Sequence, residues 1–476
     1  MEWVSAPKEN KCWEREALGA LPKEQLIELV MALQERVAEL ERRLGMNSQN
    51  SSRPPSSDLP GTERAKPPAT GRRPGGQPGH PGQFRKMVPI ERVDKLVPLK
   101  PLQCRHCGAP LTGEDPSPRR HQVVELPPIR PRVTEYQQHK LRCRCCGQTT
   151  VGEWPAGLDY GAFGERLRSL VALCTGVCHL SRRRTAFLLE SLFHVPISVG
   201  AISRSEQFVS AAIAEPVEQC QQYVQSQPVV HVDETGWPIK YHSGWLWTAA
   251  TSLATVFQIH SGRGQKEARL LLGQFEGILE SDRWGAYNAF PLMLRQVCWA
   301  HLKRDFQAMA ERGSVAGQIG SNLLELTQQM FQGWHRVRDQ TLSREQFQSQ
   351  MLSVSRQLEK LFDQGAHCGH AKTQRTCRRL LKIRPALWTF VHTEGVEPTN
   401  NAAERAIRPA VLWRKSCFGS QGPPGCRFVE RMLTVTATLG LQRRNVVEYL
   451  ALACHAALHN HAAPSLLPLA LSPAGT

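Results

Sequence analysis

The chain has 476 residues, 41% of them hydrophobic, so it is long enough for more than one folded core. Lys and Arg total 59 against 42 Asp and Glu, and the net charge of +17 favours polyanionic partners, nucleic acid first. No stretch reaches the roughly 18 apolar residues of a membrane span, and the first residues lack the apolar core of a secretory signal. With 15 Cys and no such signal, we expect a reducing cytosol and metal-binding Cys pairs. Membrane, secreted and collagen-like classes are therefore excluded.

The first segment, residues 1–46, carries apolar residues at the alternating spacing of four and three that is typical of a coiled coil. These residues are Leu26, Val30, Leu33, Val37, Leu40 and Leu44. The pattern predicts a helix through which two chains dimerise. An amphipathic helix that packs on its own chain is the alternative.

Residues 47–87 are rich in Pro and Gly, and aliphatic side chains are scarce among them. Such a segment cannot bury enough surface to fold alone, so we interpret it as a linker. Arg64, Lys66, Arg72 and Arg73 make it basic. This charge suits either contact with phosphates or a merely solvated linker.

Residues 88–155 contain two Cys-x-x-Cys-Gly knuckles and are expected to form a zinc-binding domain. Cys104 and Cys107 belong to the first knuckle, and Cys143 and Cys146 belong to the second, in which Cys145 is a spare thiol that could replace a neighbour as ligand. The Gly of each knuckle permits the positive φ that turns backbone amides toward sulfur. Four thiolates suit a tetrahedral, structural Zn²⁺ and leave no open position for chemistry. A β-hairpin is expected to fill the 35 residues between the knuckles, which include VVELP and RVTEYQQHKLRC.

Residues 160–225 are expected to be helical and to contain two short helices across a tight turn. Ser181 is the expected N-cap of the first helix, which ends near Phe193, and Ser198 that of the second. The basic residues on these helices are Arg182, Arg183, Arg184 and Arg204. The pattern fits a helix-turn-helix that binds DNA and fits equally a helical connector with a solvated basic face.

Apolar strands occupy residues 226–301, and two of them end at an acidic residue. Asp233 lies late on the strand that contains HVDETG, and Asp282 follows the strand GILES 49 residues later. A strand holds its carboxylate rigidly at the end of a sheet, where a metal ion can bind. Strands followed by alternation with helices predict a mixed α/β core. The remaining segments, expected to be largely helical, are residues 302–388, 389–425 and 426–476.

Several longer segments are distinctive. They are NSQNSSRPPSSD, the two CxxCG knuckles, HVDETGW, SDRWGAYNAF, VCWAHLKRDF and EPTNNAAERAIRP followed by WRKSCFGS. In these segments, which stretch from about residue 45 to 420, the chain resembles the insertion sequence 66 family of bacterial DDE transposases. HVDETGW and NNAAER are the most specific of them. One departure is Thr399, which stands before the Asn pair where many members carry Asp.

The resemblance implies an RNase H-like catalytic core with Asp233, Asp282 and Glu404 as its acidic triad. Glu404 belongs to NNAAER, 122 residues after Asp282. Glu394 and Glu397 are nearby acids that compete for this assignment. The expected fold class is therefore a multidomain α/β chain, with an RNase H-like mixed-sheet core interrupted by a helical insert. The N-terminal coiled coil, the disordered linker, the zinc-binding β module and the helical DNA-binding region precede this core.

The chemistry of phosphodiester cleavage agrees with such a triad. The reaction needs an activated water or 3′-hydroxyl and a stabilised leaving oxygen. Three carboxylates can hold two Mg²⁺ or Mn²⁺ ions roughly 3.5–4 Å apart, one on each of those oxygens. Mg²⁺ prefers hard oxygen ligands, so few protein ligands suffice. Asp233 is the expected bridging ligand, and Asp282 and Glu404 would each complete one ion.

Cys298 and His301 form a Cys-x-x-His pair without a clear mate for a second zinc site. The resemblance instead places the pair beside the catalytic core, with His301 as a candidate supporting residue. The basic residues that could neutralise phosphates near the triad are Lys303, Arg304, Arg405, Arg408, Arg414 and Lys415. An exposed helix face would show the same spacing.

We interpret the chain as a DNA transposase that binds the terminal inverted repeats of a mobile element, cleaves its 3′ ends and joins them to target DNA. The expected partners are double-stranded DNA, further copies in a homodimer or higher oligomer and, by the resemblance, small accessory proteins of the same element. No membrane partner is expected, and the resemblance favours the bacterial cytosol and nucleoid. One alternative is a catalytically inactive DNA-binding protein, which Thr399 keeps open. The other is an RNase H-like nuclease that never joins strands.

Overall fold

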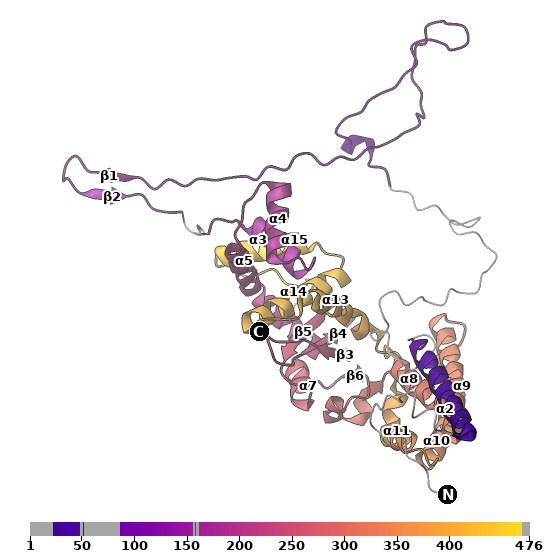
Figure 1. Ribbon diagram of the computed structural model, residues 1–476. Coiled ribbons are helices and arrows are strands. Elements are labelled where there is room, and N and C mark those ends of the chain that lie inside the picture. The colour runs from indigo at the N-terminus through magenta and orange to yellow at the C-terminus, as the bar shows by residue number, and fades with distance from the viewer. Residues whose placement is uncertain (1–21, 48–50, 52–85, 156–157, 159–160, 469–476) are drawn as a thin grey trace.

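The computed structural model describes residues 22–47, 51, 86–155, 158 and 161–468. Figure 1 shows residues 86–155 as an extended arm, which leaves a body made of a sheet with its covering helices and a second group of helices. Each of these two parts of the body has its own hydrophobic core. The mixed α/β class expected from the sequence is confirmed. Within the described residues, no helix is long and apolar enough to cross a bilayer.

One mixed sheet lies at the centre of the body, with five strands in the order β5-β4-β3-β6-β7. The strands are β3 (Val229–Gly236), β4 (Trp245–Ala250), β5 (Thr255–His260), β6 (Ile278–Ser281) and β7 (Arg295–Val297). The pairs β3–β4 and β4–β5 are antiparallel, whereas β6 pairs in parallel with β3 and with β7. The central strand β3 thus has an antiparallel neighbour on one side and a parallel neighbour on the other.

The sequence of β3 explains its two faces. Val230 and Val232 are fully buried on one face, whereas the face that carries Asp233 is only partly covered. The next strand, β4, is buried along almost its whole length, with Trp247 fully enclosed. A continuous apolar strand of this kind is typical of a sheet that is covered on both faces.

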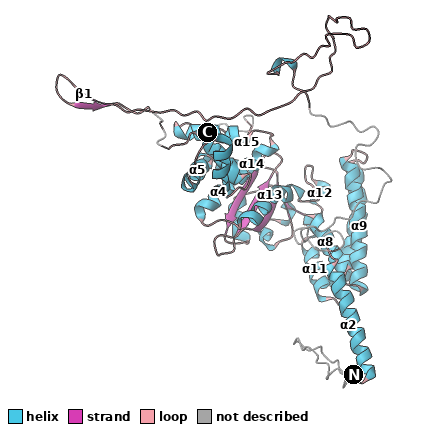
Figure 2. Cartoon of the chain, turned by 45° about the horizontal axis from the view of Figure 1, so that its top comes forward, coloured by secondary structure: helices cyan, strands magenta, loops and turns pink. Residues whose placement is uncertain are grey.

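Helices that precede, connect and follow the strands cover the sheet, and most of them share its core. They are α3 (Glu165–Gly176), α4 (Arg182–Phe193), α5 (Val199–Ala212), α6 (Ala214–Gln225), α7 (Gln265–Leu272), α13 (Asn401–Cys417), α14 (Pro423–Leu441) and α15 (Val446–Leu458). Figure 2 shows α13 and α14 beside the strands. Met432 of α14 and Leu450 of α15 are fully buried in that core. The boundary expected at residue 425 therefore falls inside a helix of the sheet body.

Helix α14 covers the outer edge of β5. Three of its side chains, one helical turn apart, accept hydrogen bonds from the backbone amides of that strand. The bonds run from Thr255 N to Thr438 Oγ1 (3.1 Å), from Phe257 N to Thr434 Oγ1 (3.1 Å) and from Ile259 N to Glu430 Oε1 (2.6 Å). An uncovered edge strand is a template for pairing with another chain. The helix therefore closes the sheet on this side.

The second part of the body is a group of helices between β7 and α13. They are α8 (Trp299–Ala310), α9 (Ser314–Arg338), α10 (Arg344–Ala366), α11 (Ala371–Lys382) and α12 (Thr389–His392). Short 3₁₀ turns precede or join them at η3 (Gly285–Ala289), η4 (Leu292–Leu294) and η5 (Arg384–Leu387). Phe306, Phe347 and Phe390 are fully buried in their core. Gly320 lets α9 lie against the end of α8, because a Cβ there would collide with the backbone of Ala310.

The arm contains little regular structure. It has a 3₁₀ turn, η2 (Ile90–Arg92), and a hairpin of β1 (Lys140–Arg142) and β2 (Thr149–Val151) around the second Cys pair. The prediction of a β-hairpin between the two knuckles was wrong for the described arm. Val123 and Val133 lie in extended backbone without a strand partner and are 81% and 85% exposed. A β-type composition forms a strand only where side chains can pack on a neighbour.

The N-terminal helix expected from the sequence is present as α2 (Lys23–Leu44). Its apolar stripe is open to solvent, with exposed fractions between 44% and 82% at Val30, Leu33, Val37, Leu40 and Leu44. The linker expected at residues 47–87 lies mostly outside the described residues.

Candidate active site

Two aspartates meet at the carboxyl ends of two parallel strands. In the pairing of β3 with β6, His231 lies opposite Glu280. Continued by two residues, this register sets Asp233 level with Asp282, which follows β6 directly. The structure therefore brings together two of the acidic residues that the sequence singled out.

Backbone amides hold both carboxylates. The amide of Glu234 donates to Asp233 Oδ1 at 2.9 Å, and the amide of Trp284 donates to Asp282 Oδ1 at 2.8 Å. Each bond limits the rotation of its carboxylate. Such support is what a site with a defined geometry requires of its surroundings.

Asn400 holds the start of α13, the helix that carries Glu404. Its side-chain Nδ2 donates to Val232 O at 2.7 Å, and its backbone N donates to Cys298 Sγ at 3.2 Å. Asn400 is almost fully buried, and Glu404 lies in the first turn of the helix. The asparagine thus ties α13 to β3 one residue before Asp233.

A buried acid of β6 supports the loop before Asn400. Glu280 Oε1 accepts a hydrogen bond from Glu397 N at 2.8 Å, and Glu280 Oε2 lies 2.9 Å from His231 Nδ1. Burial raises the pKa of Glu280, and the contact with His231 opposes this shift. Sequence analysis missed Glu280 and His231. The available signal was an acid within the otherwise apolar strand GILES.

Negative charge accumulates at this end of the sheet. Burial, followed by the charges of Glu234, Asp282 and Glu404, raises the pKa of Asp233 to about 8, although the hydrogen bond from the Glu234 amide opposes the shift. A buried carboxyl group among other carboxylates keeps its proton near neutral pH unless a cation compensates the charge. The residues present therefore fit a divalent cation that prefers oxygen ligands.

Glu234 lies on the other face of β3 and is neutralised there. Its Oε1 is 2.7 Å from Arg263 Nη2, and its Oε2 accepts a hydrogen bond from the Tyr287 hydroxyl. The Arg263 guanidinium stacks on Trp245 and Trp284, at 4.6 and 4.1 Å from the ring centroids. This cluster packs against the end of β3 on the face opposite to Asp233. Sequence analysis missed it, and the aromatic residues of SDRWGAYNAF were its only signal.

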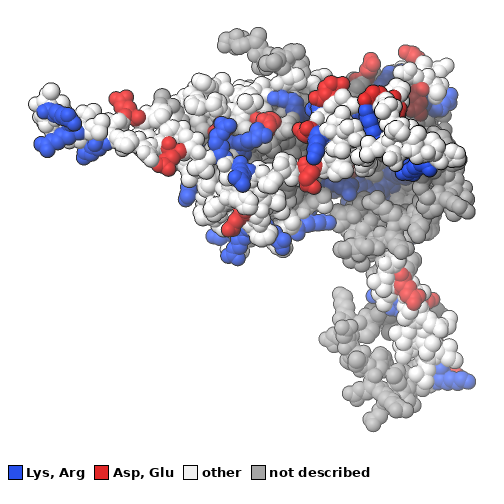
Figure 3. Space-filling view, turned by 90° about the horizontal axis from the view of Figure 1, so that it is seen from above, with Lys and Arg blue, Asp and Glu red and all other residues white. Residues whose placement is uncertain are grey.

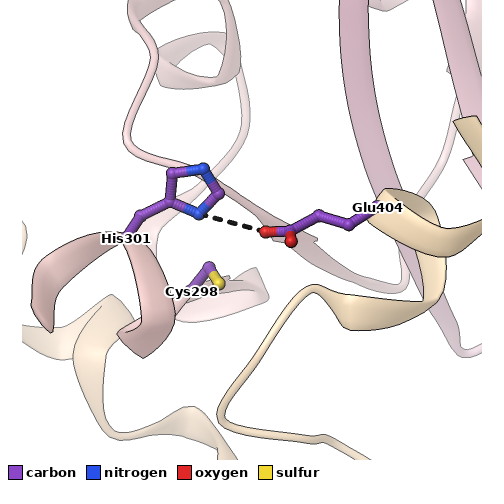
Figure 4. Close-up of side chains that lie close together, drawn as sticks. All are labelled: Cys298, His301 and Glu404. Atoms are coloured by element: carbon purple, nitrogen blue, oxygen red, sulfur yellow. Dashed lines mark ion pairs between the residues drawn. The ribbon is translucent and has the colours of Figure 1, made fainter. Parts of the chain in front are cut away.

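Cys298 and His301 lie against Glu404, and Figure 4 shows the three side chains directed toward one another. His301 Nδ1 is 3.5 Å from Glu404 Oε1, and Arg304 Nη2 is 3.9 Å from the same oxygen. One donor atom from each of the three residues lies within 4.8 Å of the others. His301 thus lies beside Glu404.

The three expected triad carboxylates do not converge on one ion position. Among the described residues, only Cys298, His301 and Glu404 bring three metal-binding atoms so close together. Glu404 is directed toward His301, and its charge still raises the pKa of Asp233. The structure thus pairs Asp233 with Asp282 and places Glu404 next to them.

A pocket of about 770 Å³ lies on the other side of α13. Its lining includes Glu397, Thr399 and Arg405, and includes none of the three triad carboxylates. Glu397 Oε2 accepts a hydrogen bond from Trp334 Nε1 at 3.3 Å, while Glu394 is exposed. Glu397 and Thr399 therefore face this pocket, whose lining includes none of the triad carboxylates.

Both Cys-x-x-Cys knuckles form tight turns. Gly108 and Gly147 adopt φ of +74° and +73°, and their amides donate to the carbonyls of Cys104 and Cys143 at 2.9 and 3.0 Å. Hydrogen bonds from the backbone amides three and two residues further along lower the pKa of Cys104 and of Cys143. Each knuckle is thus suited to thiolate ligation. The two knuckles lie apart, so no four-sulfur cluster is gathered in the described arm.

Comparison with known families agrees with this geometry. The profile described as the transposase IS66 family matches residues 160–427, which is 268 of the 476 residues. The chain belongs to the IS66 transposase family. A second profile, the zinc-finger binding domain of transposase IS66, matches residues 101–147 and so includes all four knuckle Cys. A family of unknown function matches residues 5–86.

Two proteins of Sinorhizobium fredii are similar to this transposase along most of its length. The uncharacterized protein y4qI is 25% identical over 398 residues, which cover 76% of this chain and 72% of y4qI. The uncharacterized protein y4hP is 24% identical over 401 residues, which cover 74% of this chain and 70% of y4hP. The family profiles, rather than these relatives, therefore carry the functional information: a DNA-processing, DNA-binding enzyme with a structural zinc-finger domain.

The basic residues expected to contact DNA fall into two groups in this transposase. The exposed ones are Arg183, Arg184, Arg204, Lys303, Arg405, Arg408 and Lys415. Arg182 is exposed too, but it bonds the buried Glu206 with its Nε and Nη2 at 2.9 and 2.6 Å. Arg414 donates to Thr235 Oγ1 at 3.0 Å, and Arg304 Nη2 lies 3.9 Å from Glu404 Oε1. These three arginines have structural contacts within the chain.

Helices α4 and α5 have the turn that the sequence predicted. The hydroxyls of Ser181 and Ser198 accept from the amides three residues further on at 3.3 and 3.2 Å, and His194 ends α4 with φ of 55°. The second helix buries Ile202 in contact with its neighbours, whereas α4 leaves Phe187 71% exposed. A helix-turn-helix inserts its second helix into the major groove. Here the first helix offers more open surface.

The tip of the β1–β2 hairpin is a basic feature that sequence analysis did not single out. Arg144 is exposed at the tip, and Lys140 and Arg142 are exposed on β1. Figure 3 shows Lys and Arg side chains gathered at this end of the arm. Positive charge therefore lies next to the second zinc knuckle, where a DNA-binding module can use it.

Proposed function

We propose that this transposase acts through a DDE-type active site of Asp233, Asp282 and Glu404 in an RNase H-like core. It would bind the terminal inverted repeats of its element, cleave the 3′ ends and join them to target DNA. The observation that carries the proposal is the meeting of Asp233 with Asp282, with α13 anchored beside them by Asn400. The strand order, with three antiparallel strands followed by two parallel ones, supports the RNase H-like core.

The three acids would hold Mg²⁺ or Mn²⁺. Such ions supply an activated water or 3′-hydroxyl and stabilise the leaving oxygen. The raised pKa of Asp233, caused by burial and the neighbouring carboxylates, supports a cation at this position. Both metals prefer oxygen ligands of this kind.

The surrounding residues of the chain orient these acids. The amides of Glu234 and Trp284 restrain the two aspartates, and Asn400 sets the start of the Glu404 helix. His301 lies beside Glu404 and restrains its carboxylate. An anionic phosphate that enters the site would also meet the exposed Lys303 on α8.

The other segments would bring DNA and a second copy to this core. Residues 88–155 and 160–225 would bind the element ends, and residues 47–87 would link them to α2. The exposed apolar stripe of α2 supports a coiled coil between two copies. Small accessory proteins of the same element would complete the assembly. Residues 226–301 and 389–425 would form the catalytic core around the helical insert at 302–388, followed by residues 426–476.

The test is cleavage of a labelled duplex that carries the element's own end, with Mg²⁺ and with EDTA. We expect nicking that depends on the metal and is lost in Asp233→Asn and in Glu404→Gln, while binding to the end is kept. Glu394→Gln is the matched control, because this exposed acid lies ten residues before Glu404. It should nick as the wild-type chain does.

The other outcomes separate the remaining candidates. End binding without nicking in the wild-type chain, with accessory proteins added, would make it an inactive DNA-binding protein. Nicking without joining of a pre-cleaved 3′ end would make it a nuclease. Loss of nicking in Glu394→Gln, with Glu404→Gln active, would overturn the assignment of the third acid.

A further inference from the structure

Cys298, His301 and Glu404 come from two elements that meet at the active site. Cys298 directly precedes α8, His301 lies in the first turn of that helix, and Glu404 lies in the first turn of α13. Figure 4 shows the three side chains converging on a common space. Within 4.8 Å of one another they offer one sulfur, one imidazole nitrogen and one carboxylate oxygen.

Two of these atoms lack a hydrogen-bond partner among the described residues, although Arg304 Nη2 also lies 3.9 Å from one of them, Glu404 Oε1. His301 Nδ1 and Glu404 Oε1 are both buried, and within the described part of the chain neither has a hydrogen-bond partner. At 3.5 Å, their mutual contact is an ion pair too long for a good hydrogen bond. Buried polar atoms are normally satisfied, so this pair indicates a missing ligand.

The donor set selects the class of ligand. Mg²⁺ requires oxygen ligands in near-octahedral geometry, so a thiol and an imidazole do not suit it. Zn²⁺ accepts sulfur, nitrogen and oxygen together, and a site with three protein ligands keeps a fourth position for water. The set therefore favours a borderline metal over the ions expected at the aspartates.

We propose that Cys298, His301 and Glu404 form a second Zn²⁺ site, distinct from the four-Cys zinc finger, and that Zn²⁺ bound there inhibits the enzyme. Binding removes the thiol proton of Cys298 to solvent and engages the Glu404 carboxylate. Glu404 is then withheld from the catalytic metal. The inhibitory part rests on the proposed function, whereas the metal site itself does not.

The site is tested first by the zinc content of the full chain, measured with a chromophoric chelator and by equilibrium dialysis. We expect about two Zn²⁺ per wild-type chain, one of them in the four-Cys finger. Cys298→Ser and His301→Asn should each weaken the second zinc at least about tenfold, because loss of a direct ligand costs no less than loss of its support. Cys178→Ser, which changes an exposed thiol, is the control and should bind as the wild-type chain does.

Cobalt gives a readout that does not depend on folding yield. Co²⁺ at the second site should add a sulfur-to-metal absorption band that saturates after the finger and is absent from Cys298→Ser. Circular dichroism identifies a variant that has failed to fold, and His301→Asn then provides the independent comparison. One zinc per wild-type chain, or an unchanged second zinc in both variants, would overturn the proposed site.

Inhibition is tested by adding free Zn²⁺ to the Mg²⁺-dependent nicking reaction. The wild-type chain should lose activity over the zinc range that fills the second site, and Cys298→Ser should need at least about tenfold more zinc for the same fractional loss. If the wild-type chain nicks DNA at the same rate with the second zinc bound, the inhibitory role is overturned. If no nicking occurs even without zinc, the proposed function fails, while the zinc count still tests the site.

Discussion

Asn400 is the residue on which the placement of Glu404 depends most directly. Its buried Nδ2 donates to Val232 O at 2.7 Å, so Asn400→Ala leaves that carbonyl without its partner. We expect a loss of about 1–3 kcal/mol in the free energy of unfolding. Nicking should fall further than stability explains, since the start of α13 can then move away from β3.

The adjacent Asn401 provides the matched control. It is exposed on the first turn of α13, so Asn401→Ala should change neither stability nor nicking appreciably. Urea unfolding and the nicking assay check both variants. Equal losses in the two variants would show that the buried bond of Asn400 does not position Glu404.

Asp233 should make the metal-free chain less stable as the pH rises. Burial and neighbouring carboxylates raise its pKa from 3.8 to about 8 in the fold. Between these two values the unfolded chain has released the proton and the folded chain still holds it, so stability falls from about pH 4 to pH 8 and then levels off. Asp233→Asn removes this penalty because the amide does not ionise.

Thermal unfolding in EDTA checks the sign of this effect. At pH 8.5 Asp233→Asn should melt several degrees above the wild-type chain, at roughly 2–4 °C per kcal/mol, and the gap should narrow toward pH 5. Mg²⁺ should raise the melting temperature of the wild-type chain more than that of the variant. The exposed Asp339→Asn should show no such pH dependence. A difference in melting temperature between the variant and the wild-type chain that narrows as the pH rises would contradict the raised pKa of Asp233.

Among the elements, α14 protects the edge of the sheet. Thr434→Val keeps the shape of the side chain but leaves Phe257 N–H without its 3.1 Å partner. We expect a loss of about 1–3 kcal/mol, seen as a lower urea midpoint with an unchanged slope. Thr436→Val is the control, because that hydroxyl bonds only Met432 O of its own helix. Equal urea midpoints for Thr434→Val and Thr436→Val would show that the hydrogen bond between α14 and β5 contributes no stability.

Helix α2 has an exposed apolar stripe that we expect to pack against the same helix of a second copy. Leu33 is 55% exposed within it, so Leu33→Glu places a charge in the expected seam of the coiled coil. The dimer Kd should rise at least about tenfold, because burying one Leu contributes about 1.5–3 kcal/mol. Gln34→Glu adds the same charge beside the stripe and should not weaken the dimer. Sedimentation velocity of the full chain distinguishes the two, and a monomeric wild-type chain would exclude the coiled coil.

Elements whose ends are set by local chemistry could be predicted from the sequence. The caps at Ser181 and Ser198 lie where hydroxyl residues precede helical patterns, and the structure has both helices at those positions. The meeting of Asp233 and Asp282 could be predicted because Asp233 lies late on an apolar strand and Asp282 directly follows another. Glu404 required the family resemblance, since a glutamate on a helix carries no local signal of its partners.

Elements that depend on distant contacts could not be predicted in this way. Thr434 lies 177 residues from the Phe257 amide that it satisfies, and no local pattern links them. Glu280 and His231 form their contact only through strand register. The strands expected around Val123 are absent from the described arm. The residues there have a β-type composition, but no described neighbour packs against them.

At the scale of the whole molecule, the net charge of +17 does not say which Lys and Arg side chains can contact DNA and which form ion pairs within the chain. Arg182 and Arg183 are neighbours on α4 and illustrate the difference. Both are exposed, but of the two only Arg182 bonds a buried acid, Glu206, at 2.6 Å. From the sequence both were candidates for DNA contact and equally for a solvated face, since an arginine run looks the same whether or not its members are paired.

The salt dependence of binding to the element end distinguishes arginines that contact DNA from arginines that form ion pairs within the chain. Each phosphate contact that is lost should reduce the slope of log K against log salt by about 0.9, so Arg183→Gln with Arg184→Gln should reduce it by nearly two. Arg182→Gln should instead lower the melting temperature and leave the slope unchanged, because it strips the buried Glu206 of its partner. Fluorescence anisotropy over a series of KCl concentrations measures the slope. An unchanged slope in the double variant would move the DNA contacts from α4 to the basic tip of the β1–β2 hairpin.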